Sequence, residues 1–247
     1  LIGISSSMKN VRSAIERIAP TASRVLISGP NGSGKELAAR SIHHQSDRGD
    51  ARFIVANCAR LGTERADVEL FGSENLSTSR RIVGLFEQAH KGTLYFDEIC
   101  DLPMETQGKI VRAVTEQRFR RIGGNKEVSV DVRVISASSR DLAEEIRAGR
   151  LREDLYYRLG VVPLNMPPLA DRRDDIPHLA RHFVDMVARR TGLSRVKLGD
   201  EVLAAMQGYH WPGNVRQMLN TIENMVIMAP PDRSQPLGLD LLPAEIQ

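Results

Sequence analysis

The stretch GPNGSGKE, residues 29–36, decides how the rest of the chain is interpreted. It matches the pattern GxxxxGK, directly after the apolar run RVLISG (24–29) and directly before a segment with helical periodicity. In this order, glycines let backbone N–H groups surround phosphate oxygens, and the following helix N-terminus adds positive potential. Lys35 is expected to reach the β and γ phosphates. The usual Ser or Thr after the lysine is Glu36 here, so a metal contact is expected from Ser33 or from water. The stretch predicts a phosphate-binding loop rather than a tight turn alone.

A second signal is TLYFDE, residues 93–98, an apolar run that ends in two carboxylates. Asp97 can hold Mg²⁺, directly or through water, and Glu98 can orient an attacking water. Taken alone, the pair fits a solvated acidic turn equally well. Following a phosphate loop, the pair favours nucleotide chemistry.

Strand-like and helix-like segments alternate around these two motifs. Apolar runs predict strands at 24–29, 53–58, 93–98 and 132–138, and helical spacing predicts helices at 11–18, 35–44 and 105–116. Apolar strands separated by helices are typical of a parallel sheet covered on both faces. The fold class is therefore α/β, with the phosphate loop at the end of one strand.

The pattern changes at VVPLNMPPLADRRDDIP, residues 161–177, where three prolines are expected to interrupt regular structure. Beyond it the spacing predicts helices at 176–191, 200–207 and 214–229, with Asp174 or Asp175 as a cap and Pro177 in the first turn. We therefore expect an α/β nucleotide-binding subdomain over residues 1–170 and a small all-helical subdomain over 171–247.

Composition is ordinary for a soluble globular protein, with 41% apolar and 26% charged residues and a formal net charge of +3. The arginines are dispersed, so charge alone does not indicate nucleic-acid binding. No apolar run approaches the ~20 residues that span a bilayer. Cys58 and Cys100 form no metal-binding pattern, are expected to be packing residues, and fit a reducing cytoplasm. Because the chain begins at Leu1, we expect it to be part of a longer protein.

Two motifs carry arginines of open meaning. Arg152 and Arg158 bracket the helix-like run in RLREDLYYRL (150–159), where they could act across a subunit interface or simply pair with Glu153 and Asp154. In WPGNVRQ (211–217), Asn214 is expected to cap a helix with Arg216 in its first turn. A cation there opposes the helix dipole, which suggests an external anion.

Taken in this order, the motifs resemble the central AAA+ ATPase domain of bacterial enhancer-binding proteins, the NtrC family. The resemblance covers nearly the whole chain, including FIVANCARL, ELFG, FEQAHKGTLYFDEI, FRRIGG, VDVRVISASSRDL, LREDLYYRLGVVPLNMPPLADRRDDIP and YHWPGNVRQ. It implies a P-loop NTPase with a helical lid, ATP or ADP with Mg²⁺ as cofactors, and a dimer or hexamer-type ring. It also implies a receiver domain and a helix-turn-helix domain outside this chain, which would engage a sensor kinase and DNA.

The resemblance assigns a role to each matching residue. The Walker B pair would be Asp97, the Mg²⁺ ligand, and Glu98, with Asn57 pairing with Glu98 as a switch. Arg152 and Arg158 would be arginine fingers, and Arg216 the lid arginine called sensor II. Nucleotide-binding residues would be Ile2 and Gly3 near the adenine, then Gly29, Pro30, Asn31, Gly32, Ser33, Gly34, Lys35, Glu36 and Leu37.

Two departures from the family pattern matter. The family's first sensor is a Thr-Asn pair at the end of a strand, and in this chain the two positions are Ser138 and Ser139. Sigma-54 activators carry Gly-Ala-Phe-Thr-Gly-Ala after ELFG, whereas this chain has SENLSTSRRIVG, residues 73–84. The chain therefore resembles the NtrX branch, which lacks that contact loop and is associated with nitrogen metabolism. We expect a cytoplasmic, nucleotide-binding transcription regulator with weak ATP hydrolysis at most and unlikely sigma-54 contact. The alternatives are a sigma-54 activator with a substituted loop that uses Arg80 and Arg81, and a nucleotide-blind dimerisation scaffold.

Two further features have a plain interpretation. His178 and His182 have metal-ligand spacing but no third ligand, so they are expected to be a helix face. Arg118, Arg120 and Arg121 could face a pore or nucleic acid, but a solvated hairpin is favoured.

Overall fold

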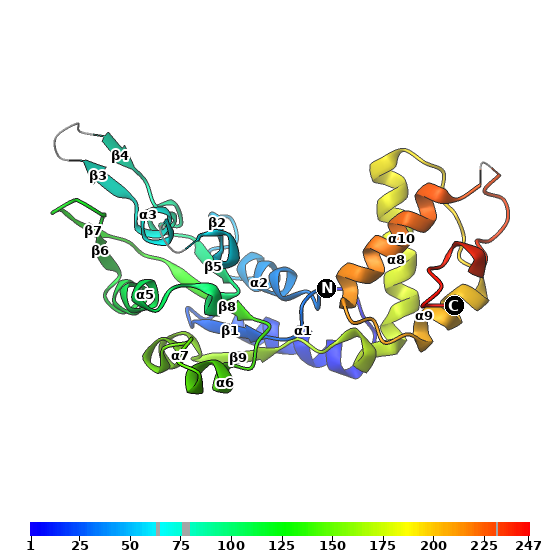
Figure 1. The fold of residues 1–247 in the computed structure, drawn as a ribbon, viewed down its shortest axis with the longest axis horizontal. Helices are drawn as coiled ribbons and strands as arrows, with labels where there is room; N and C mark the ends of the chain where they lie inside the picture. Colours follow the sequence, from blue (N-terminus) through cyan, green and yellow to red (C-terminus); the bar gives the residue numbers. More distant parts are fainter. Residues whose placement is uncertain (63–64, 76–79, 231) are drawn as a thin grey trace. The chain divides into compact units, whose positions relative to one another are not determined.

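The computed structural model describes residues 1–62, 65–75, 80–230 and 232–247. Its contacts divide the chain into two compact units, which are described separately (Figure 1). The sheet unit comprises Ser13–Gly29 and Lys35–Asn165. The lid unit comprises Leu1–Arg12, Pro30–Gly34 and Met166–Gln247, so the N-terminal segment and most of the phosphate loop belong to it by their contacts.

The sheet unit is built on a five-stranded parallel sheet in the order β2-β5-β8-β1-β9. The strands are β1 (Val25–Ser28), β2 (Phe53–Asn57), β5 (Thr93–Asp97), β8 (Arg133–Ser138) and β9 (Val162–Asn165). All six residues of the central strand β8 are buried, as expected where helices cover both faces of a sheet. The predicted α/β class and its parallel sheet are confirmed.

Strand β9 was not expected, because Pro163 lies inside it. It pairs only with β1 among the described strands and so forms one edge of the sheet. Proline is tolerated at an edge, where its missing N–H faces away from the ladder. Regular structure is interrupted only later, at Pro167 and Pro168.

Helices of the sheet unit agree with the periodicity. The helix α2 (Lys35–His44) has its predicted bounds, α5 (Met104–Glu116) begins one residue early, and α1 (Ser6–Ile18), which crosses from the lid unit, begins five residues early. The remaining helices are α3 (Ala66–Phe71), α4 (Leu85–Gln88), α6 (Leu142–Arg147) and α7 (Glu153–Leu159), with short 3-10 turns η1 (Cys58–Arg60) and η2 (Ile99–Asp101).

The lid unit is helical, as predicted. The short turn η3 (Leu169–Asp175) leads into α8 (Ile176–Thr191), α9 (Asp200–Gly208) and α10 (Asn214–Met228), and η4 (Leu239–Leu241) follows. Their apolar faces enclose the fully buried Trp211, whose Nε1 donates to Met206 O.

Asp175 precedes α8 but does not cap it with its side chain. Its carboxylate accepts from the N–H groups of Ile4 and Ser5 and from Ser5 Oγ, at the start of α1. The expected cap of one helix therefore anchors the beginning of another within the same unit.

Two hairpins extend side by side from one end of the sheet unit (Figure 1). Strands β3 (Ser73–Asn75) and β4 (Arg80–Ile82) form one, and β6 (Arg118–Arg120) and β7 (Glu127–Ser129) the other. The substituted contact segment thus forms a hairpin, although its residues 76–79 and the side chain of Arg80 lie outside the described part. The second hairpin was expected, but Arg121 beside it is buried rather than solvated, paired with Glu87.

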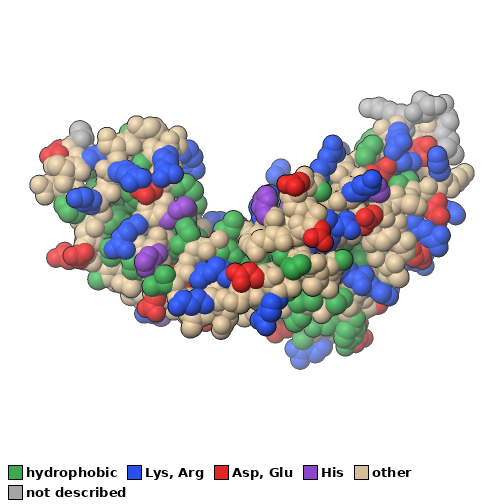
Figure 2. Space-filling model, turned by 180° about the vertical axis from the view of Figure 1, so that it is seen from behind, with side chains coloured by type: hydrophobic (Ala, Val, Ile, Leu, Met, Phe, Trp, Pro, Cys, Tyr) green, Lys and Arg blue, Asp and Glu red, His purple; other side chains and the backbone are tan. Residues whose placement is uncertain are grey.

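Lys and Arg side chains are scattered over the visible face and interspersed with Asp and Glu (Figure 2). Among the described residues, no helix has both the length and the apolar character needed to cross a bilayer.

Candidate functional site

Lys35 begins α2 and is buried, with 6% of its surface exposed. Its Nζ donates to Gly29 O at 2.9 Å and lies 3.2 Å from Glu98 Oε1. The motif lysine and the strand-end glutamate are therefore brought together in the sheet unit, as the resemblance implies for a nucleotide site.

Glu98 follows β5 in the left-handed region, with φ 56° and ψ 59°. Its second carboxylate oxygen, Oε2, accepts from Ser139 N at 2.8 Å and from Ser139 Oγ at 2.9 Å. Both carboxylate oxygens thus have partners. Ser139, a shorter side chain than the asparagine that the family carries at this position, contacts the glutamate directly.

Asn57 does not form the expected switch pair in this structure. It ends β2, opposite Asp97 in the ladder, and its exposed side chain makes no hydrogen bond with any described residue. Ser139 occupies the role of hydrogen-bond partner to Glu98 instead. Ser139 directly follows β8, which is the other neighbour of β5 in the sheet.

Asp97 is the last residue of β5 and is half-buried. Tyr95 Oη donates to its Oδ1 at 3.0 Å. Burial raises the pKa of Asp97, and the positive charge of Lys35 opposes that rise. A half-buried carboxylate with a free oxygen suits a hard cation such as Mg²⁺, which would offset its desolvation.

The loop Pro30–Gly34 has donors available for phosphate. The N–H groups of Asn31, Gly32 and Gly34 donate to no acceptor among the described residues. Gly32 and Gly34 have φ of +75° and +105°, which favours glycine. The Ser33 hydroxyl is buried without a hydrogen-bond partner, so this predicted metal contact can still take a ligand.

Glu36 and Leu37 lie on the exposed side of α2. The carboxylate of Glu36 is paired with Arg40 at 2.7 Å, one helical turn further on. Because a carboxylate is negative and already paired, Glu36 does not replace the usual hydroxyl as a metal ligand. Its predicted place among the nucleotide-binding residues stays a prediction.

Besides the loop residues, three predicted residues lie in the lid unit. Arg216 is exposed on the first turn of α10, and its Cβ lies 3.1 Å from where a Cβ on Gly32 would be. Ile2 packs against the apolar core of this unit. Gly3 has φ +146°, and a Cβ there would approach Asp175 Oδ2 to 2.7 Å. The structure thus places sensor II beside the loop, and its role remains a prediction.

The two candidate arginine fingers differ in their partners. Arg152 forms a bidentate pair with Asp154, with both N–O distances 2.9 Å, as the plain interpretation predicted. Arg158, near the end of α7, forms no ion pair with any described residue. Burial and, as a smaller cause, the charge of Arg158 lower the pKa of Arg24. The finger role stays a prediction for both arginines.

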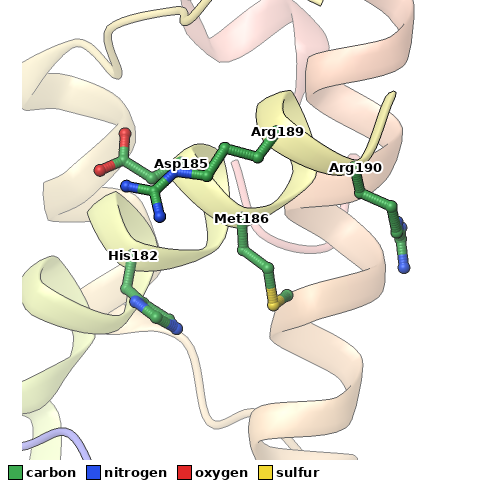
Figure 3. A pocket seen from close by; sticks show the side chains of 5 residues that line it. All are labelled: His182, Asp185, Met186, Arg189 and Arg190. Carbon is green, nitrogen blue, oxygen red and sulfur yellow. The ribbon is translucent and has the colours of Figure 1, made fainter. Parts of the chain in front are cut away.

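His182 lies on α8 beside Met186, on a shallow surface with Asp185, Arg189 and Arg190 (Figure 3). Among the described residues, no group of three or more His, Cys, Asp or Glu could hold a metal ion. His178 and His182 both lie on α8, and their interpretation as a plain helix face stays a prediction. Cys58 and Cys100 are buried free thiols, which agrees with their predicted packing role.

Sequence reasoning missed Arg172 and the true role of Asn214. Arg172 is 3% exposed and donates from Nη2 to Ser33 O, while Asn214 Nδ2 donates to Asn31 O. Nothing in the run ADRRDD distinguishes Arg172 from Arg173, which is exposed. Asn214 was expected to be a cap, but it is the first residue of α10 and its side chain binds the loop instead.

Two known families match the chain. The Sigma-54 interaction domain matches residues 1–165, and the AAA+ ATPase lid domain matches residues 170–247.

Curated relatives match over the full chain. The nitrogen assimilation regulatory protein NtrX of Azorhizobium caulinodans is 48% identical, covering 100% of this chain and 54% of that protein. PilR of Pseudomonas aeruginosa is 42% identical over 99% of this chain and 56% of its own length, and NtrC of Escherichia coli K12 is 40% identical over 100% and 52%. The chain spans about half the length of these relatives.

Solved structures give the same match. NtrX from Brucella abortus in complex with ADP has a TM-score of 0.94 at 45% identity, covering 100% of this chain and 55% of that chain. Its complex with ATP has a TM-score of 0.93 at 46% identity, covering 100% and 57%. Hsp104 of S. cerevisiae, at 16% identity, shares the fold alone, with a TM-score of 0.68 and coverage of 91% and 45%.

Proposed function

Since the chain belongs to the Sigma-54 interaction domain family and carries an AAA+ lid, we propose that it binds ATP or ADP together with Mg²⁺. The observation that carries this proposal is the loop itself. Its N–H groups at Asn31, Gly32 and Gly34 have no described acceptor, and Lys35 begins the helix that follows. The matching solved structures of NtrX hold ADP and ATP, at 45% and 46% identity to this chain.

The available side chains fit these ligands. The loop N–H groups and Lys35 would hold phosphate oxygens, and Asp97 would hold Mg²⁺ directly or through water. The metal, when bound, neutralises charge that develops on the transferred phosphoryl group. Glu98 would orient the attacking water, and Ser139 fixes the carboxylate that does so. Arg158 of one subunit is proposed to reach the phosphate of the next, with Arg152 in a supporting place.

The wider function is proposed by analogy with NtrX. The domain would serve a two-component transcription regulator whose receiver and DNA-binding domains engage a sensor kinase and DNA. Nucleotide would control self-association and DNA binding, with weak hydrolysis. The support is the 48% identity to a nitrogen assimilation regulator.

The hairpin β3–β4 stands where activators of the family carry Gly-Ala-Phe-Thr-Gly-Ala. Its described residues are polar or charged at Ser73, Glu74 and Asn75, and Arg81 is paired with Glu87 at 2.6 Å. A paired arginine and polar neighbours are a poor substitute for a Phe-Thr contact. We therefore propose that this domain does not remodel sigma-54 polymerase. ATP-dependent open-complex formation with sigma-54 polymerase would establish the alternative, an activator with a substituted loop.

Calorimetric titration with MgATP and MgADP tests the central proposal. We expect the protein to bind both, and Lys35→Ala to weaken each by at least about a hundredfold, since a charge-assisted phosphate contact is lost. Lys126→Ala removes the same charge from an exposed turn and should bind as the wild type does. Absence of binding by the wild type would favour the nucleotide-blind scaffold.

A further inference from the structure

The outer side of the phosphate loop is held by the lid unit to which it belongs. Three consecutive carbonyl oxygens each accept one hydrogen bond: Asn31 O from Asn214 Nδ2 at 2.9 Å, Gly32 O from Val215 N at 3.0 Å, and Ser33 O from Arg172 Nη2 at 2.8 Å. All six residues lie in the lid unit.

These bonds determine where the loop's N–H groups point. In a planar trans peptide, the C=O of one residue and the N–H of the next point in opposite directions. Holding the carbonyl of Asn31 therefore orients the N–H of Gly32, and holding that of Ser33 orients the N–H of Gly34. Those two N–H groups have no acceptor among the described residues. The lid unit thus turns two donors toward a ligand.

Arg172, which donates to Ser33 O, is an unusual residue at a buried position because its side chain is charged. Its guanidinium is buried, and its Nε has no hydrogen-bond partner among the described residues. Its Nη1 contacts the sulfur of Met8 at 3.0 Å, and it forms no ion pair with any described carboxylate. Burial lowers the pKa of Arg172, with Asp175 opposing the shift. The charge of Asp175 offsets part of the cost of burying Arg172 without forming an ion pair with it, and a ligand that supplies negative charge would offset more of that cost.

Asn214 is also buried, and both polar atoms of its side chain form hydrogen bonds. It is 3% exposed, its Oδ1 accepts from Leu169 N at 2.8 Å, and it sits at φ 52°, which asparagine and aspartate tolerate better than most residues. Gly32 permits the close approach, because a Cβ there would lie 2.3 Å from Gly213 O.

We propose that Arg172 and Asn214 are positioning residues for polyphosphate: they orient the N–H groups of Gly34 and Gly32, and Arg172 adds a buried positive charge that the phosphates neutralise. This inference rests on the proposed binding of nucleotide. It adds to the residues proposed to contact phosphate two residues that orient the N–H groups of the loop.

Three variants and two controls test the inference, each measured by calorimetric titration with MgATP and by thermal unfolding without nucleotide. Arg172→Met keeps length and apolar contact but removes charge and donors. Arg172→Lys keeps the charge and a donor. Asn214→Asp keeps the acceptor for Leu169 and the left-handed backbone but removes the donor to Asn31. Matched controls are Arg173→Met, an exposed neighbour, and Asn220→Asp, exposed on α10.

We expect Arg172→Met and Asn214→Asp to lose affinity for MgATP by about tenfold or more, equivalent to ~1.4 kcal/mol, while both controls stay within about twofold of the wild type. Arg172→Lys should retain more affinity than Arg172→Met. A merely structural residue would show the reverse order, because methionine fills an apolar site better than lysine.

Binding of MgATP by folded Arg172→Met within about twofold of the wild type would overturn the inference, as would lysine performing no better than methionine. If Arg172→Met does not fold, the comparison of Asn214→Asp with Asn220→Asp and the retention by Arg172→Lys decide the matter. Failure of the proposed function is a different result, since the wild type itself would then not bind.

Discussion

Lys35 Nζ lies 3.2 Å from Glu98 Oε1, so the residue proposed to bind phosphate is paired with the residue proposed to orient water. Ser139 holds the other oxygen of the same carboxylate. A polyphosphate would therefore compete with Glu98 for the lysine. When the lysine turns to phosphate, Oε1 of Glu98 becomes available to a water.

The first prediction concerns this competition. Glu98→Gln removes the negative charge that attracts Lys35 and repels phosphate, so we expect about threefold to tenfold tighter binding of MgATP with slower hydrolysis. Calorimetry and a phosphate-release assay measure the two effects. Glu116→Gln is the matched control, because Glu116 is an exposed glutamate paired with Arg118 and has no predicted role in the site. Weaker binding by Glu98→Gln would show that the ion pair does not compete with nucleotide.

The second prediction concerns Ser139, the serine that stands in place of the family's sensor asparagine. Ser139→Ala removes one of two donors to Glu98 Oε2 and leaves the backbone donor, so the carboxylate loses part of its orientation. We expect the single-turnover rate of ATP hydrolysis to fall about threefold to tenfold, with nucleotide affinity changed less than about twofold. Ser136→Ala, on the strand β8 that ends just before Ser139, is the control because its hydroxyl has no described partner. An equal fall in the hydrolysis rate of both variants would contradict the prediction, because it would show a general effect on β8 rather than the loss of a donor to Glu98.

The sequence predicted the fold class, the all-helical lid and the bounds of α2 and α8, because each depends on local apolar spacing and turn chemistry. It also identified Lys35 and Glu98 as candidate site residues, because each lies in a contiguous motif, and the structure brings their side chains together. It could not predict the partner of Glu98. Ser139 lies 41 residues away, and the contact depends on β8 lying next to β5, which no local pattern sets.

Arg172 was missed for the same physical reason. Its contact with Ser33 spans 139 residues of sequence, and its burial depends on how η3 packs in the lid unit. At Pro163 the sequence predicted an interruption of regular structure, but the residue lies inside strand β9. Proline does disfavour strands, but the rule relaxes at a sheet edge, and sequence alone does not say which strand is the edge.

The third prediction is a pH dependence of stability. Glu145 accepts from Arg150 at 2.7 and 3.0 Å and from Arg140 at 3.2 Å, and these partners hold its pKa at about 2, below its usual 4.5. A lowered folded pKa means that the stabilisation is complete above about pH 4.5 and is lost as pH falls toward 2.

Glu145→Gln should therefore lower stability at pH 7 by about 1–2 kcal/mol, and the difference from the wild type should shrink below pH 4.5. Urea unfolding across the pH range measures it. Glu144→Gln, an exposed neighbour on α6, should show neither effect. A difference that stays constant down to pH 3 would contradict the assignment to this carboxylate.

The last prediction concerns the hairpin that replaces the contact loop. Arg121 is buried and binds Glu87 through two N–O contacts of 2.8 Å, and it also reaches Glu74 of β3 at 3.4 Å. Burial by itself would raise the pKa of Glu87, but the ion pairs with Arg121 and Arg81 outweigh it and keep that pKa low.

Arg121→Met leaves this carboxylate with one exposed partner, so we expect a loss of about 3 kcal/mol in the free energy of unfolding. Arg121→Met combined with Glu87→Leu should recover part of that loss, because no charge is then left buried alone. Amide exchange at Glu74, which donates to Ile122 O at 2.9 Å, should accelerate in Arg121→Met, since the two hairpins separate locally. Arg120→Met, exposed on β6, is the control. If it destabilises as much as Arg121→Met, general charge balance rather than the buried pair holds the hairpins.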